Sequence, residues 1–118
     1  MKEFFNKHYL FFIRLVYCSV IILFLNIFNP TIVHGSSMQP TLSSGDTLFL
    51  NTLDKTVEVG DIVVIEPLPV FCGNSVIKRV TQIKDDKIWI EGDNKENSFD
   101  SRDVGWIPIE SVLGVVIL

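Results

Sequence analysis

The hydrophobic pattern of the first thirty residues is continuous, unlike that of the rest of the chain. From residue 10 to residue 28 every side chain is apolar except those of Arg14, Ser19 and Asn26. At the rise of an α-helix this run is about 30 Å long, which is the thickness of the hydrocarbon core of a bilayer. The pattern predicts one membrane-spanning helix, which we place at residues 9–29.

Beyond Pro30 the apolar residues form short runs separated by clusters of Gly, Asp, Asn and Pro, without a helical period. This pattern is typical of an all-β domain, and about ninety residues can form a small folded-sheet or barrel-like core. We expect strands at Thr47 to Leu50, Asp61 to Ile65, Val76 to Ile83, Lys87 to Glu91 and Ser111 to Ile117. Pro30 is the expected exit from the helix.

The positive charges near the N-terminus predict the orientation of the helix. Lys2, Lys7 and Arg14 lie at its front, and no further Lys or Arg occurs before Lys55. The positive-inside rule therefore places residues 1–8 in the cytoplasm and residues 30–118 outside the membrane. A cleaved secretory signal is the alternative, but the apolar run is longer than a usual signal core and no Ala-x-Ala site follows it before residue 30. We expect a retained, single-pass anchor.

Charge and cysteine content exclude several classes of function. Residues 1–30 carry three basic groups and one acidic group, a charge of +2, so the remaining seven basic and thirteen acidic groups give −6. An acidic body argues against nucleic-acid binding. Cys18 and Cys72 are isolated, so neither a disulfide framework nor a CxxC metal or redox site is available. Cys72 is predicted to be a bystander thiol.

A candidate nucleophile follows the membrane helix. Ser37 lies in the segment Gly35 to Leu42, within about nine residues of the helix, which is at most roughly 30 Å of extended chain. A serine hydroxyl needs a base to become nucleophilic. His8 is on the cytoplasmic side, and His34 points to the opposite face if the segment is extended. Neither histidine suits the role.

Lys78 is the better candidate for the base. In a strand it shares a face with Val76 and Val80, and burial among apolar side chains disfavours the ammonium form. Its neighbour Arg79 stays protonated at any physiological pH and cannot act as a base. The alternative is a lysine on the surface of an edge strand, with no catalytic role.

A polar, turn-rich segment from Gly92 to Arg102 is too long for a simple hairpin connection. A hydroxyl such as Ser98 could orient the lysine amine there, while Asp100 and Arg102 form a charge-assisted pair that holds the loop. The alternative is a solvated loop with an Asx turn. The residue types alone leave both open.

Taken together, these segments resemble the type I signal peptidases, membrane-bound Ser-Lys proteases that remove signal peptides, in a minimal form. The family's nucleophile box Ser-Met-x-Pro-Thr-Leu matches Ser37 to Leu42, and its last box Gly-Asp-Asn-x-x-x-Ser-x-Asp-Ser-Arg matches Gly92 to Arg102. Its Gly-Asp strand box and its lysine box match Gly60 to Val64 and Ile77 to Val80. Four boxes in order behind an anchor make a chance match a poor explanation.

The resemblance implies a role for each matched position. Ser37 becomes the nucleophile, Lys78 the general base, Ser98 the hydroxyl that positions the lysine amine, and Asp100 with Arg102 the supporting ion pair. It implies an all-β folded sheet and chemistry without a metal or other cofactor. Small substrate residues would enter shallow apolar pockets, for which the expected walls are Val33, Met38, Leu42 and Ile77; ordinary core packing is the alternative for each.

The sequence departs from the family pattern at the oxyanion hole. Many bacterial members have a serine two positions before the nucleophile, whereas this chain has Gly35, as mitochondrial inner-membrane relatives do. The backbone N–H of Ser37 can still donate, and either Ser36 or a water could supply a second hydrogen bond. The lysine box runs into Thr81-Gln82-Ile83, where the family often has a Gly-Pro-Gly turn.

We therefore expect a membrane-anchored serine endopeptidase that cleaves translocated preproteins at the outer face of the membrane. Its expected partners are signal peptides and the lipid bilayer, near the protein translocation machinery, and not nucleic acid. The expected location is a cell membrane, with the mitochondrial inner membrane as the alternative. The competing hypotheses are a peptidase dedicated to one exported substrate, and an impaired paralogue that binds signal peptides without cutting them. Self-cleaving repressors share the Ser-Lys pair but have a DNA-binding domain where this chain has the helix.

Overall fold

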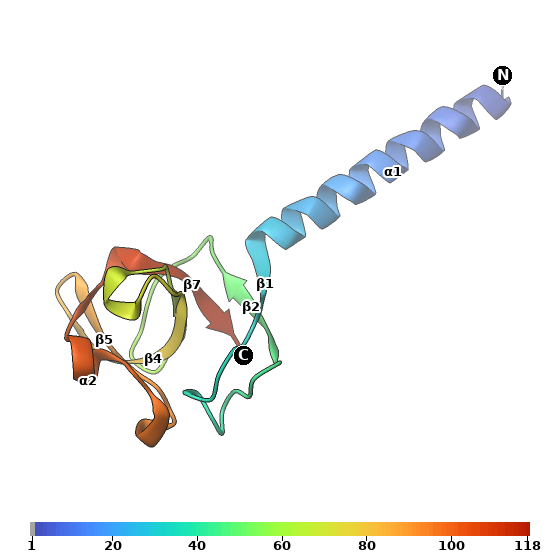
Figure 1. Cartoon of the computed structure of the whole chain (residues 1–118). Helices are drawn as coiled ribbons and strands as arrows, with labels where there is room; N and C mark the ends of the chain where they lie inside the picture. Colours follow the sequence, from blue (N-terminus) through green and yellow to red (C-terminus); the bar gives the residue numbers. More distant parts are fainter. Residues whose placement is uncertain (1) are drawn as a thin grey trace.

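The computed structural model describes residues 2–118 as one long helix followed by a β-domain (Figure 1). Met1, the first residue of the expected segment 1–8, lies outside the described residues. Helix α1 (Lys2–Ile27) projects away from the domain, and its stretch Asn6–Ile27 is long and apolar enough to cross a membrane, with none of it buried. The single apolar helix in front of an all-β domain agrees with the sequence prediction.

The chain passes from helix to sheet without a loop. Helix α1 ends at Ile27, three residues before Pro30, and β1 (Phe28–Ile32) begins at once. Proline disfavours helical conformation in the residue before it and has no N–H to donate to a ladder. It is tolerated in β1 because β1 lies at the edge of the sheet and pairs only with β2 among the described residues.

The domain is a single antiparallel sheet curled into a half-barrel, with the strand order β1-β2-β7-β3-β4-β5-β6. Its remaining strands are β2 (Thr47–Asn51), β3 (Ile62–Ile65), β4 (Val76–Lys84), β5 (Lys87–Glu91), β6 (Ile107–Pro108) and β7 (Val112–Ile117). Short helical turns lie between them: η1 (Pro69–Phe71), η2 (Lys95–Asn97), α2 (Ser101–Val104) and η3 (Ile109–Ser111). The five expected strands are all present within a residue or two of their predicted ends.

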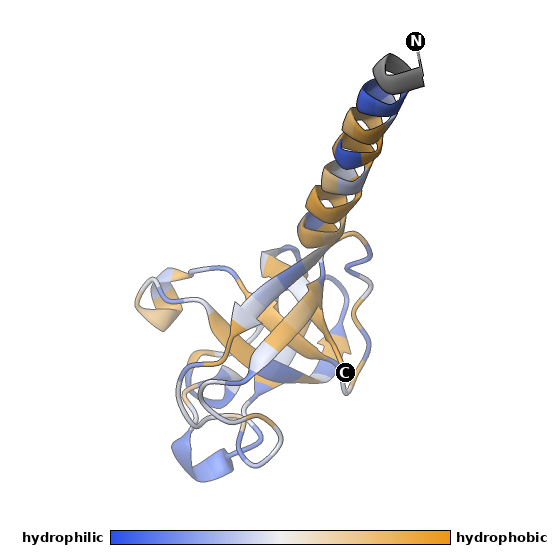
Figure 2. Ribbon diagram, turned by 90° about the vertical axis from the view of Figure 1, so that its right-hand side faces the viewer, coloured by the Kyte–Doolittle hydropathy of each residue, from blue (hydrophilic) through white to orange (hydrophobic). Residues whose placement is uncertain are grey.

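The strand β3 packs against hydrophobic residues on both faces of the sheet. All four of its residues are buried, and they alternate between two hydrophobic clusters on opposite faces of the sheet. Ile62 and Val64 join the first cluster, with Val33, Met38, Leu42, Leu48, Leu50 and Val116. Val63 and Ile65 join the second, with Phe71, Val80, Ile88, Ile90, Ile107 and Val112. Figure 2 shows hydrophobic residues on several strands of the curled sheet and along most of α1. The curled sheet therefore has a core on each side.

Candidate active site

Ser37 lies in a turn directly after β1. Two apolar side chains of the turn, Met38 and Leu42, pack into the first cluster. They are 2% and 5% exposed. The Leu42 N–H donates to the carbonyl of Met38 over 2.9 Å, and the Gln39 N–H donates to that of Ser36 over 3.2 Å. Ser37 itself is half-buried. Burial of the residue that follows it therefore fixes the turn while Ser37 stays accessible.

Lys78 is the third residue of β4, the strand that lies between β3 and β5 in the sheet. It is 4% exposed and shares a face with Val76 and Val80, both part of the second cluster, as the alternation in the sequence predicts. Within residues 2–118 its side chain forms no hydrogen bond or ion pair. Lysine is rarely buried without a partner, and here the residue is buried and unpaired. Because no side-chain nitrogen or oxygen within residues 2–118 is both fully buried and unpaired, its amine keeps a small exposed area.

Burial dominates the protonation of Lys78. Desolvation lowers the pKa of its ammonium group, the negative charge of Asp100 raises it in opposition, and the positive charge of Arg102 lowers it further, for a net decrease. The pKa is therefore below the ordinary value of 10.5. The neutral amine, which is the form that can accept a proton, becomes more populated near neutral pH.

Gly92 lies in close contact with both Ser37 and Ser98. A Cβ at this position would lie 2.6 Å from the Ser37 carbonyl oxygen and would overlap the Ser98 hydroxyl. The ladder between β4 and β5 pairs Arg79, which follows Lys78, with Glu91, which precedes Gly92. The absence of a side chain at residue 92 thus lets the turn that contains Ser37 and the loop that contains Ser98 come together.

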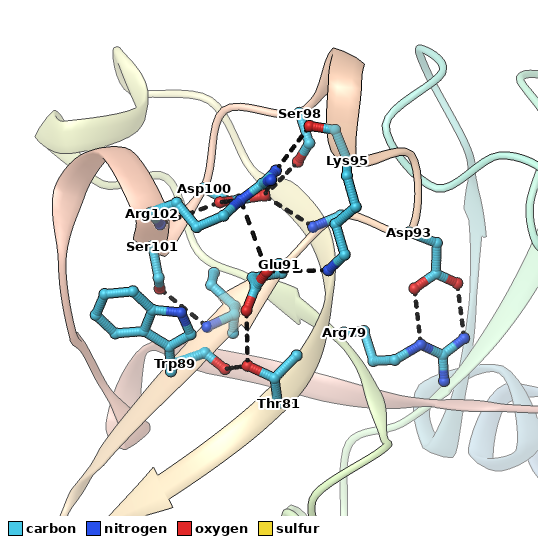
Figure 3. Close-up of polar contacts among 12 residues, drawn as sticks. Arg79, Thr81, Trp89, Glu91, Asp93, Lys95, Ser98, Asp100, Ser101 and Arg102 are labelled. Carbon is cyan, nitrogen blue, oxygen red and sulfur yellow. Dashed lines mark hydrogen bonds and ion pairs between the residues drawn. The ribbon is translucent and has the colours of Figure 1, made fainter.

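A buried carboxylate, Asp100, organises the loop that follows Gly92 (Figure 3). Its side chain is 0% exposed and accepts hydrogen bonds from the Ser98 hydroxyl at 2.6 Å and the Gly92 N–H at 2.9 Å. Arg102 donates from both Nε and Nη2 at 3.0 Å, the expected ion pair. Although burial alone raises the pKa of Asp100, these hydrogen bonds hold it well below its usual range. Asp100 therefore remains ionised.

The hydrogen bond from Ser98 to Asp100 sets what Ser98 can do. A hydroxyl has one proton, and this one is donated to the carboxylate, so the Ser98 oxygen is left as an acceptor. A neutral amine that donates an N–H to such an oxygen keeps its lone pair for another proton. Ser98 has no hydrogen bond to Lys78 among the contacts of the described chain, so its positioning role remains a proposal.

A second carboxylate, Asp93, joins three segments in a way that the sequence analysis missed. Arg79 donates to both of its oxygens at 2.8 Å, and the Thr41 hydroxyl donates to one of them at 2.5 Å (Figure 3 shows the Arg79 pair). Arg79 also donates to the carbonyl of Gly60 at 2.7 Å. One ion pair therefore ties the lysine strand to the turn that contains Ser37.

The same loop binds the backbone on either side of the candidate nucleophile. The N–H of Asn94 donates to the Ser37 carbonyl at 2.8 Å, and its side-chain amide donates to the Ser36 carbonyl at 3.0 Å. The side-chain amide of Asn97 donates to the Ser36 hydroxyl. In the sequence, both asparagines were part of a polar loop without an assigned partner. Their contacts show that the loop 93–97 positions the nucleophile turn.

The four expected pocket residues do not have the same surroundings. Val33, Met38 and Leu42 are buried in the first hydrophobic cluster, and Ile77 packs against that cluster while it is half-buried. Ile77 also lines an open groove of about 370 Å³ between the end of β1 and the start of β4, together with Pro30, Thr31, Ile32, His34, Val64 and Ser75. Some of its lining residues precede Ser37 in the sequence and one is Ile77, the residue before Lys78, but neither Ser37 nor Lys78 itself lines the groove.

Among residues 2–118, no group of three or more His, Cys, Asp or Glu side chains is placed to hold a metal ion. Both cysteines are free and exposed. The hydrophilic residues brought together around Gly92 are therefore a lysine, serines and two ion pairs. A buried, unpaired lysine whose neighbour Arg79 is tied through Asp93 to the turn of Ser37 is suited to acyl transfer with the lysine as base.

Comparison with known proteins places this arrangement in a family. The sequence matches the family described as "Signal peptidase, peptidase S26" over residues 6–84 and 81–118, which is nearly the whole chain. It is 29% identical over 109 residues to mitochondrial inner membrane protease subunit 1 of Xenopus tropicalis, covering 74% of this chain and 65% of the relative.

Human and plant relatives show the same similarity. The chain is 32% identical over 103 residues to mitochondrial inner membrane protease subunit 1 of Homo sapiens, which covers 68% of this chain and 61% of the relative. It is 29% identical to mitochondrial ATP-independent inner membrane protease subunit 1a of Arabidopsis thaliana, covering 78% and 70%. The chain thus spans less than two thirds of the frog and human relatives. The family match, supported by these similarities, shows that the chain belongs to the signal peptidase family, peptidase S26.

Proposed function

We propose that the chain is a membrane-anchored serine endopeptidase that removes N-terminal signal peptides from translocated preproteins. Ser37 is the nucleophile and Lys78 the general base. The observation that carries this proposal is the buried, unpaired side chain of Lys78, whose pKa is lowered and which is influenced by the charge of Asp100, the carboxylate that binds Ser98 and Gly92. Family membership supports the reaction class, and burial lowers the pKa of the proposed base, which favours the neutral amine that a general base requires.

In the first half of the proposed reaction, the neutral amine of Lys78 removes the hydroxyl proton of Ser37 as its oxygen attacks the carbonyl carbon of the scissile bond. The resulting ammonium then gives a proton to the departing amine, which leaves an acyl-enzyme on Ser37. Ser98, whose own proton is held by Asp100, accepts an N–H from the amine and orients its lone pair. Arg102 keeps Asp100 ionised for this purpose.

In the second half, Lys78 removes a proton from water, whose oxygen attacks the ester carbonyl; as the bond to Ser37 breaks, the Lys78 ammonium returns a proton to the Ser37 oxygen and the acid product leaves. The oxyanion of both steps needs fixed donors. The Ser37 N–H donates to no other group within residues 2–118 and is the first donor. The Ser36 hydroxyl already accepts a hydrogen bond from Asn97, so its proton is free for the oxyanion, and a water is the alternative second donor.

The groove between β1 and β4 is the proposed binding site for the residues before the scissile bond. Its shallow walls, which include Ile77 and Val64, fit an extended peptide with small side chains. A peptide bound there would follow the segment that leads to Ser37, which lies ten residues after the end of the membrane helix. Cleavage therefore takes place near the membrane surface.

The proposed location follows the orientation of α1, with the N-terminus in the cytoplasm and the β-domain outside a cell membrane, near the translocation machinery. The relatives are named as mitochondrial inner membrane proteases, which makes that membrane the second proposed location. Fractionation of the source cells, with protease protection of the β-domain, distinguishes the two. A substrate survey separates a general signal peptidase from one dedicated to a single exported protein.

The test is cleavage of a preprotein that carries an Ala-x-Ala site by the detergent-solubilised full chain, with product N-termini read by mass spectrometry. The expected result is one cut after the second Ala by the wild type and none by Ser37→Ala. Equal cleavage by the two proteins would rule out Ser37 as nucleophile. A folded wild type that binds the preprotein without cutting it would instead support the impaired-paralogue hypothesis.

A further inference from the structure

The turn that follows β2 lies directly against the end of the membrane helix. The hydroxyl of Thr52 is 3.3 Å from the carbonyl oxygens of both Asn26 and Ile27, the last two residues of α1. Those carbonyls have no partner within the helix, because a helix leaves its last four carbonyls unpaired. The apolar stretch that can cross a membrane also ends at Ile27. A bilayer spanned by α1 therefore has its surface at the level of Thr52.

The next residue is an exposed hydrophobic side chain. Leu53 is 73% exposed. A single exposed leucine is ordinary on a surface that faces water. Here, however, the neighbouring Thr52 contacts the end of α1. Leu53 is therefore close to the end of the stretch that can cross a membrane.

Several polar groups of this turn are paired with one another by hydrogen bonds. The side-chain oxygen of Asn51 accepts hydrogen bonds from the N–H groups of Leu53 and Asp54, at 3.2 and 3.1 Å. The Asp54 carboxylate accepts from the N–H and the hydroxyl of Thr56, at 3.0 and 2.6 Å. Backbone groups that are paired in this way do not lose hydrogen bonds to water when lipid covers the turn. Leu53 is thus presented by a preformed turn.

We infer that the turn Asn51–Thr56 is a second membrane contact, with Leu53 inserted at the boundary between acyl chains and headgroups of the leaflet that α1 reaches at Ile27. The exposed Lys55 extends its ammonium to the lipid phosphates, as lysines at membrane interfaces do. Two points of contact, α1 and this turn, fix how the β-domain is tilted. The groove beside Ile77 is then held at a constant height above the bilayer.

Tryptophan fluorescence tests this contact in the full chain. The two native tryptophans are first removed by Trp89→Phe and Trp106→Phe, and a single probe is introduced by Leu53→Trp. The matched control is Glu96→Trp, at an exposed position in η2, the orange turn at the bottom of the domain in Figure 1, away from α1. Each protein is inserted into vesicles of phosphatidylcholine and phosphatidylglycerol, with ordinary or brominated acyl chains.

The expected result is that the Leu53→Trp protein emits at a shorter wavelength than the control and loses most of its emission in brominated lipid, while the control keeps its emission. Equal emission from the two proteins, quenched or unquenched, would overturn the inference. A partner protein covering this turn instead of lipid would give the unquenched outcome.

Because tryptophan itself favours membrane interfaces, a second probe is needed. In a background of Cys18→Ser and Cys72→Ser, the rate of labelling by a water-soluble maleimide is compared for Leu53→Cys and Glu96→Cys in the same vesicles. Labelling at residue 53 is expected to be several-fold slower, and equal rates would contradict the inference. Neither measurement uses peptidase activity, so its result is independent of the proposed function.

Discussion

Ser37 and Lys78 are held in place by different kinds of interaction. Lys78 lies in a nine-residue strand between β3 and β5, and its side chain is buried on an apolar face of the sheet. Ser37 lies in a turn outside the strands, and Asn94 and Asp93 connect that turn to the rest of the site by hydrogen bonds. The proposed base is therefore positioned by packing, whereas the turn of the proposed nucleophile depends on polar contacts in addition to the buried Met38 and Leu42.

This difference determines how the site should fail when it is changed. Loss of a polar contact to the turn displaces a reacting atom without opening the core, so activity falls more than stability. Replacement of Lys78 by an apolar residue is expected to raise stability while activity is lost, because an unpaired ammonium that is largely buried is unfavourable. The following predictions test this contrast, from the largest expected effect to the smallest.

The first prediction compares Ser37→Ala with Lys78→Met. Each is expected to lower kcat/KM by at least about 10³-fold, the scale on which loss of a nucleophile or base acts. Thermal unfolding in detergent should leave Ser37→Ala unchanged and show Lys78→Met to be more stable than the wild type. A Lys78→Met protein that is less stable than the wild type would contradict the proposed contrast, and so would one that is fully active.

The second prediction concerns the buried carboxylate. Asp100→Ala removes the acceptor of five hydrogen-bond donors and is expected to lower the free energy of unfolding by about 3 kcal/mol, since it leaves buried donors unpaired. The pKa of Asp100 is lowered in the fold, so its contribution is present above the ordinary carboxyl pKa and is lost as the pH falls through the lower folded value. Urea unfolding between acid and neutral pH measures both effects. An unchanged free energy of unfolding would show that Asp100 does not hold the loop.

The third prediction uses the glycine between the two regions. Gly92→Ala must shift the Ser37 backbone or the Ser98 hydroxyl, and a shift of this size is expected to lower kcat/KM by about 10²-fold. Gly45→Ala is the matched control, because that residue has open space around it but a φ of 96°, which disfavours alanine. The control should lose stability and keep its activity. Similar activities for the two variants would show that Gly92 is not the meeting point of the site.

The fourth prediction is the smallest. Thr41→Val keeps the shape of the side chain but removes the hydroxyl that donates to Asp93, and it should lower kcat by less than about tenfold, with KM and the unfolding temperature unchanged. Thr41→Ser restores the donor and should restore kcat. If both variants behave alike, the hydroxyl does not position the turn.

The sequence predicted the regular parts of the fold well, for physical reasons. The strand predicted at Lys87 to Glu91 has the same ends as β5, because apolar and polar side chains alternate there. The strand β1 was not predicted, because it contains a proline and follows a helix without a turn residue. An edge position removes the penalty of proline, and pairing to β2 is a long-range event that no local pattern reveals.

The candidate site shows the same division. Burial of Lys78 follows from its apolar neighbours in the strand, and the pair of Asp100 and Arg102 is close in sequence. The helix α2 has a local signal as well, since Asp100 and Asp103 form a capping box. Asp93, by contrast, finds its partners 52 and 14 residues away, at Thr41 and Arg79, and only the folded chain brings them together.

The most direct test of the account is the titration of Lys78 in the active protein. Chains with ¹⁵N-labelled lysine side chains are titrated by NMR, and the pH dependence of kcat/KM is measured in the same detergent. The account predicts a lysine resonance, absent from Lys78→Met, that titrates below 10.5, together with activity that rises with pH through the same pKa. Cleavage by Ser37 while Lys78 is still protonated would contradict the assignment of Lys78 as the general base.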